Sequence, residues 1–96
     1  MRKAAAAAIG FLSVAVATAA SAQPPAGAAS CSGCHPSSAR VSSPVPRLTG
    51  VDRAAIVKAM QDFRSGQRSG TVMDRIAKGF TDDEIQAIAA WYATQK

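Results

Sequence analysis

Two cysteines and a histidine stand close together in the first half of the chain. They form the segment Cys31-Ser32-Gly33-Cys34-His35, which has the spacing of a c-type haem attachment sequence. The two thiols can add across the porphyrin vinyl groups as thioethers, because a two-residue gap on a helical segment matches the separation of the vinyls. His35 follows directly, which places its imidazole beneath the iron. We therefore predict one covalent haem c, attached through Cys31 and Cys34, with His35 as the proximal iron ligand.

Three other interpretations of these five residues are a redox disulfide of the thioredoxin kind, half of a zinc site and an ordinary structural bridge. A thioredoxin-like protein needs a βαβ pattern around the motif, which the sequence does not show. A structural zinc site needs further cysteine or histidine ligands, whereas the chain has only two cysteines and one histidine. A bridge across two residues closes a loop too tight to stabilise a fold. The composition therefore favours haem attachment.

The iron of such a haem has a second axial position, for which methionine is a suitable ligand. Met60 and Met73 are the candidates that follow the motif. Met60 falls on the apolar face of a predicted helix, where a methionine that fills the core is the favoured interpretation. Met73 follows Gly70 in a predicted loop, where its side chain is free to reach a metal. We therefore predict Met73 as the distal ligand. An iron closed by His35 and Met73 has no vacancy for a substrate, which predicts an electron carrier and not an enzyme.

The segments that must position these residues show helical periodicity, and no alternating apolar pattern suggests a strand. Asp52 can cap a helix that runs through Phe63 and is stopped by Ser65 and Gly66. One face of this predicted helix carries the apolar residues Ile56, Ala59, Met60 and Phe63.

A second helix is predicted at the end of the chain. Thr81 and Glu84 have the spacing of a capping box, and Asp82 and Asp83 place negative charge at the helix N-terminus. Its apolar stripe is Ile85, Ile88, Ala89 and Tyr92. The other segments read as a linker with a short helical approach to the cysteines (23–30), two loops (36–46 and 67–71) and a short turn (72–78). Together they predict an all-α fold of about three helices around one haem.

Residues 1–22 have the composition of a targeting signal. Arg2 and Lys3 give a positive start, residues 4–18 are apolar and rich in alanine, and Ala20-Ser21-Ala22 is a site that a signal peptidase accepts. An uncleaved membrane anchor is the alternative, since the run approaches the roughly 20 apolar residues of a spanning helix. The small-residue site and the proline pair after it favour a signal. We expect cleavage after Ala22, export to the periplasm, no membrane insertion of the mature chain, and a single monohaem domain over residues 23–96.

The size and the charge of the chain limit the classes of function that it can have. The whole chain has 96 residues, and a domain this small usually needs disulfides, a metal or a cofactor to complete its core. The formal net charge is +5, but the basic residues are scattered singly and are not interleaved with aromatic residues. A nucleic-acid partner is therefore not expected.

The chain resembles a class I cytochrome c domain over essentially the whole predicted mature segment. The features that match are CSGCH, the segment Pro46-Arg47-Leu48-Thr49-Gly50, the methionine, and an amphipathic closing helix with aromatic residues. In that family the proline carbonyl accepts the proton of the proximal histidine, so the resemblance implies that Pro46 supports His35. The N-terminal helix of the family is reduced here to residues 24–30. Trp91 and Tyr92 either cover that gap as core residues or contact the haem directly.

Within that family, segments 63–66 (FRSG) and 71–81 (TVMDRIAKGFT) look like the haem domain of flavocytochrome c sulfide dehydrogenase. This resemblance supports Met73 as the distal ligand. It implies an FAD-containing flavoprotein partner that oxidises sulfide and passes electrons singly to the haem. Two alternatives stay open at this point, namely a freely diffusing electron carrier for another oxidoreductase or respiratory complex, and a haem sensor with an open iron site.

Overall fold

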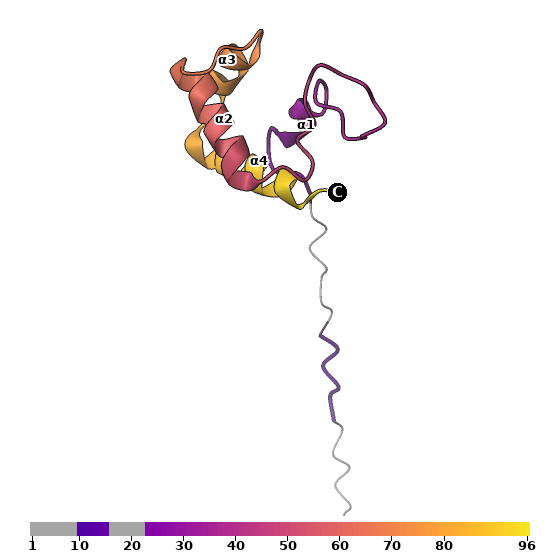
Figure 1. Cartoon of the computed structure of the whole chain (residues 1–96). Helices are drawn as coiled ribbons and strands as arrows, with labels where there is room; N and C mark the ends of the chain where they lie inside the picture. The colour runs from indigo at the N-terminus through magenta and orange to yellow at the C-terminus, as the bar shows by residue number, and fades with distance from the viewer. Residues whose placement is uncertain (1–9, 16–22) are drawn as a thin grey trace, which may run out of the picture.

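The computed structural model describes residues 10–15 and 23–96, and all of its regular elements are helices (Figure 1). In chain order they are α1 (Ala28–Cys31), α2 (Arg53–Ser65), α3 (Met73–Ile76), the 3-10 turn η1 (Ala77–Gly79) and α4 (Asp82–Thr94). No strand occurs in these described residues, and the all-α prediction is confirmed. The described residues form four α-helices where about three were expected, because the segment expected to be a short turn contains α3, a helix of 4 residues.

The predicted targeting signal lies mostly outside the part of the chain that the structure describes. Residues 1–9 and 16–22 are not covered, so the charged start and the cleavage site stay predictions. In the residues that are described, none of the helices combines the length and the apolar character that a membrane span requires.

The core forms where α2 and α4 pack against each other (Figure 1). Helix α2 buries Ile56 and Val57. Helix α4 buries the whole predicted stripe, Ile85, Ile88, Ala89 and Tyr92, which confirms the helical periodicity read from the sequence. Ala28 of α1, fully buried, belongs to the same cluster. The helix that carries the first cysteine is therefore anchored directly to the closing helix.

Helix α2 continues two positions beyond its predicted end. Ser65 is still helical, and its hydroxyl donates to the carbonyl of Asp62 at 3.2 Å. The helix ends at Gly66, which has φ 83° and donates its N–H to the carbonyl of Phe63. This left-handed conformation favours glycine because a residue with a Cβ is strained at such a positive φ. The stop therefore lies at the glycine and not at the serine before it.

The segment predicted as a short turn over residues 72–78 is more regular than expected. It forms α3 and continues directly into η1. Ala77 is fully buried and packs this turn against the rest of the molecule, whereas Ile76 beside it is exposed. Tertiary packing has stabilised a helical turn in a stretch too short to be helical alone. Met73 is consequently the first residue of a helix and does not lie in a loop.

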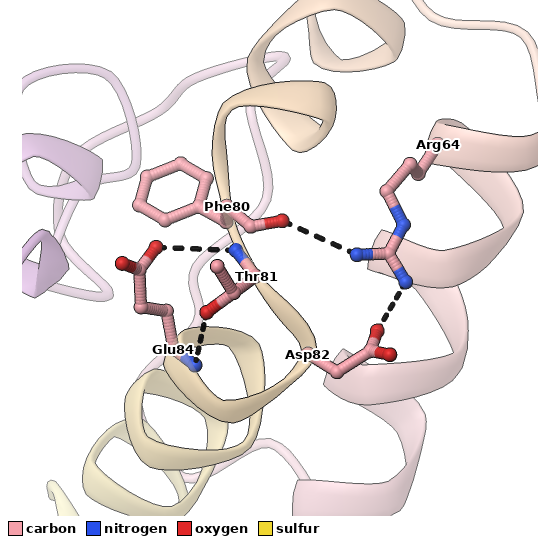
Figure 2. A network of polar contacts seen from close by, with 5 residues as sticks. All are labelled: Arg64, Phe80, Thr81, Asp82 and Glu84. Carbon is pink, nitrogen blue, oxygen red and sulfur yellow. Dashed lines mark hydrogen bonds and ion pairs between the residues drawn. The ribbon is translucent and has the colours of Figure 1, made fainter.

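The start of α4 has the predicted capping box. The Thr81 hydroxyl accepts the N–H of Glu84 at 3.2 Å, and the Glu84 carboxylate accepts the N–H of Thr81 at 3.2 Å (Figure 2). These two bonds satisfy N–H groups that the first helical turn leaves without partners.

Arg64 ties the end of α2 to this start of α4. Its guanidinium donates to the carbonyl of Phe80 at 3.2 Å and pairs with the carboxylate of Asp82 (Figure 2). Both ends of the segment that connects α2 to α4, which contains α3, are thereby held close together. The position of Met73 depends on this connection, because α3 lies within it.

Candidate functional site

A cavity of about 710 Å³ is lined on one side by residues of α1 and the loop after it, and on the other by residues of α2 and α3. All five residues predicted to hold or support the haem line it: Cys31, Cys34, His35, Pro46 and Met73. Most of the remaining wall is apolar, with Leu48, Val51, Ile56, Phe63, Ile85 and Ile88 among its residues. The fold thus brings the predicted ligands from three segments of the chain to one apolar space.

The attachment motif starts in α1 and continues in a helical turn. The N–H groups of Cys34 and His35 both donate to the carbonyl of Cys31, at 3.2 and 2.9 Å. Cys31 and Cys34 are not joined by a disulfide bridge in the structure. Burial raises the pKa of the Cys31 thiol above its ordinary value of 9.0. This environment is unlike that of a reactive redox cysteine, whose pKa is lowered.

The imidazole of His35 is held by the loop that follows the motif. Its Nδ1 lies 2.5 Å from the carbonyl oxygen of Pro46. A backbone carbonyl can only accept, so Nδ1 carries the proton and donates it. In the neutral imidazole with this tautomer, Nε2 carries the lone pair that can bind a metal. The contact between His35 and Pro46 that the resemblance implied is present in the structure.

Two methionines line the cavity, Met60 from α2 and Met73 from the start of α3. Met60 also packs against the core cluster, in agreement with the interpretation made from its helical position. Met73 lies beside Gly70, where an added Cβ would meet its side chain at 3.4 Å and the ring of Phe63 at 2.9 Å. This close packing holds the loop before α3 near the cavity. An imidazole and thioether sulfurs around an apolar space form a donor set that fits a haem iron.

The hydroxyl of Tyr92 forms a contact that sequence reasoning missed. It donates to the carbonyl of Ala28 at 2.7 Å and lies 3.0 Å from the hydroxyl of Ser32. Since the phenol has one proton and donates it to Ala28, the Ser32 hydroxyl must be the donor in the second bond. Tyr92 therefore contacts Ala28, the first residue of α1, and Ser32, the residue directly after α1. These two contacts hold α1 on both sides of Cys31. The shortened N-terminal helix, noted in the sequence, was the available signal for such a support.

Trp91 packs edge-on against Tyr92, with ring centroids 4.8 Å apart and an interplanar angle of 82°. Neither aromatic residue belongs to the lining of the cavity. Of the two interpretations left open by the sequence, the structure thus favours core packing over direct contact with a ligand in the cavity.

Comparisons with known proteins give several relatives, although no family model matches the chain. It is 43% identical over 63 residues to the "Cytochrome subunit of sulfide dehydrogenase" of Chlorobaculum tepidum and 40% identical over 65 residues to the "Thiosulfate dehydrogenase electron acceptor" of Stutzerimonas stutzeri. Each alignment covers 66% of this chain, but it spans 57% of the first relative and 30% of the second. The "Cytochrome c-554(548)" of Halomonas halodenitrificans is 33% identical over 70 residues, which are 69% of this chain and 84% of that protein.

Proposed function

The chain belongs to the class I cytochrome c family, and from this membership we propose that it is an exported haem subunit that accepts electrons from a sulfide-oxidising flavoprotein. As a member of this family it carries covalently bound haem c and is an electron carrier without a catalytic activity of its own. The electron donor, the export and the role of each residue are parts of the proposal.

In the proposal, Cys31 and Cys34 would hold the haem as thioethers, and His35 and Met73 would bind its iron. Bound there, the haem supplies a one-electron couple. His35 presents the lone pair of Nε2 while Pro46 accepts the proton of Nδ1, which fixes the tautomer and the orientation of the ring. The single observation that carries this assignment of the haem site is the bond between His35 and Pro46, two residues that line the apolar cavity together with both cysteines and Met73.

The axial positions and the walls of the cavity explain why the proposed role is electron transfer. Two protein ligands leave no open iron position, which argues against a sensor that binds gases. Apolar walls exclude water and favour the less charged, reduced state of the iron. The axial methionine also raises the reduction potential of a haem iron.

The proposed donor is an FAD-containing protein that oxidises sulfide. It is supported by the relative named as the cytochrome subunit of sulfide dehydrogenase and by the resemblance of segments 63–66 and 71–81. Location in the periplasm is supported by the composition of residues 1–22, which predicts a cleaved signal peptide.

A freely diffusing electron carrier is the second candidate function. It is favoured by the relative cytochrome c-554(548), because the alignment covers 84% of that protein and leaves little room for another domain in it. The two candidates differ in whether a stable flavoprotein complex exists.

Purification of the protein from its native source, without a tag and under anaerobic conditions, tests the proposal. We expect an FAD-containing protein to accompany the haem through two different columns, and sulfide to reduce the haem within this complex. The cytochrome separated from its partner is the necessary control, because sulfide can reduce a haem directly. Equal rates of reduction with and without the flavoprotein, or absence of any FAD protein, would favour the freely diffusing carrier.

A further inference from the structure

Two arginines stand out in the wall of the cavity. Among the described residues that line it, Arg47 and Arg68 are the only ones with a permanent charge, and no carboxylate lies beside them in the lining. A haem c carries two propionate carboxylates, which an apolar wall cannot neutralise. A carboxylate held against an apolar wall without a counter-ion is unfavourable, so a propionate in this cavity needs a cation in the wall.

Arg47 is held in place on the side of His35. It follows Pro46, whose carbonyl accepts the proton of that histidine. Its Nε donates to the carbonyl of Ser37 at 3.2 Å, and one terminal N–H donates to the hydroxyl of Thr49 at 2.9 Å. These bonds fix the plane of the guanidinium and leave its other N–H groups without a protein acceptor among the hydrogen bonds of the described residues.

The charge of Arg47 has no protein counter-ion in the described part of the chain. The two ion pairs there join Lys58 to Asp62 and Arg64 to Asp82. Arg47 is only partly exposed, so water compensates its charge incompletely. A guanidinium that is planar and already oriented loses little entropy when it binds a carboxylate through two N–H groups.

Arg68 is in a different situation. It is exposed, and its guanidinium lies 4.8 Å from the centroid of the Phe63 ring. The ring face partly compensates its charge by a cation–π interaction. Arg47 is therefore the cation of the cavity that most needs an anionic partner.

We propose that the guanidinium of Arg47 binds a propionate of the haem and that Arg47 is a second recognition element of the cofactor site, separate from the CSGCH motif. This inference rests on the proposed attachment of the haem through Cys31 and Cys34. The positive charge of Arg47 offsets the propionate and disfavours the additional positive charge of the oxidised iron. Arg47 thus stabilises the reduced state of the protein.

The test uses the purified holoprotein with Arg47→Gln and, as a matched control, Arg40→Gln. Arg40 lies in the same loop, but it is exposed and does not line the cavity. Reduction potentials are measured by spectroelectrochemistry at low and at high salt, and the propionate bending mode by resonance Raman spectroscopy. For Arg47→Gln we expect a several-fold fall in the equilibrium constant for reduction that persists at high salt, together with a shifted propionate mode. The control should show a smaller change that salt screens.

Equal potentials in the two variants at both salt concentrations, with an unshifted propionate mode, would overturn this inference. If Arg47→Gln does not accumulate as holoprotein, Arg47→Lys provides the comparison, because it keeps the charge and loses the planar fork. An unshifted propionate mode in Arg47→Lys would then contradict the proposal. All of these results leave the proposed electron-transfer function untouched, whereas a wild-type protein without covalent haem would refute the proposed attachment itself.

Discussion

Replacement of Tyr92 by phenylalanine tests how the attachment segment is held. The variant keeps the ring and its edge-on packing against Trp91, but it removes the hydroxyl that contacts Ala28 and Ser32. Ala28 is fully buried, so its carbonyl loses its partner and gains no water in return. Ser32 is exposed, and its hydroxyl can bond to solvent instead.

The expected loss of stability follows from the two hydrogen bonds that are removed, one to a buried carbonyl and one to an exposed hydroxyl. A hydrogen bond contributes about 1 kcal/mol net, and a buried polar group left unpaired costs about 1–3 kcal/mol. We expect Tyr92→Phe to lower the free energy of unfolding by about 2–3 kcal/mol. Ser32→Ala, the matched control, should lower it by about 1 kcal/mol, because the Tyr92 hydroxyl still donates to Ala28. For a domain of this size, each kcal/mol corresponds to a fall in Tm of about 4–8 °C.

The assay is denaturation of the holoprotein followed by circular dichroism for wild type, both single variants and the double variant. If Ser32 acts through Tyr92, Ser32→Ala should cost almost nothing once the hydroxyl of Tyr92 is absent. An equal cost of Ser32→Ala in both backgrounds would refute the arrangement in which Ser32 donates to Tyr92. A Tyr92→Phe variant as stable as wild type would refute the role of the hydroxyl altogether.

The same hydroxyl predicts a pH dependence. Burial raises the pKa of Tyr92 above its ordinary value of 10.0 in the folded protein, although Ser32 donates to it. The unfolded chain then loses this proton at a lower pH than the folded chain does. The stability due to the protonated hydroxyl is complete below about pH 10 and falls as the pH rises through the folded pKa. The difference in unfolding free energy between wild type and Tyr92→Phe should therefore shrink above pH 10, and a constant difference would contradict the raised pKa.

Two further predictions concern the distal ligand and the start of α1. Met73→Ala should abolish the absorption band of the methionine–iron bond and lower the reduction potential, whereas Met60→Ala should keep the band; the opposite pattern would assign the ligand to Met60. Gly27→Ala should lower the free energy of unfolding by about 2–3 kcal/mol, because Gly27 has φ 86° and an added Cβ would lie 2.7 Å from the ring of Phe80. The control Gly66→Ala, at φ 83° in open space, should cost about 1 kcal/mol, and equal thermal shifts of the two variants would disprove the steric part.

Features that depend on neighbours in the sequence were predictable. The capping box joins residues three positions apart, and the apolar stripe of α4 follows from the helical period, so both are present as predicted. The ends of elements were less accurate. Helix α2 runs to Ser65 and not to Phe63, because it ends at Gly66. Residues 73–79 are helical where a turn was expected, because the packing of the buried Ala77 outweighs the local preference of this short segment.

The sequence by itself determined the chemistry of the protein. Cys31, Cys34 and His35 lie within one helical turn, so their relative positions depend on local backbone geometry and not on the rest of the fold. Only the tertiary structure decided what surrounds it. The bond from His35 to Pro46 spans 11 residues, and the bond between Ser32 and Tyr92 spans 60. Contacts over such distances depend on the path of loops and the packing of α4, because loop closure brings together residues that no local pattern relates.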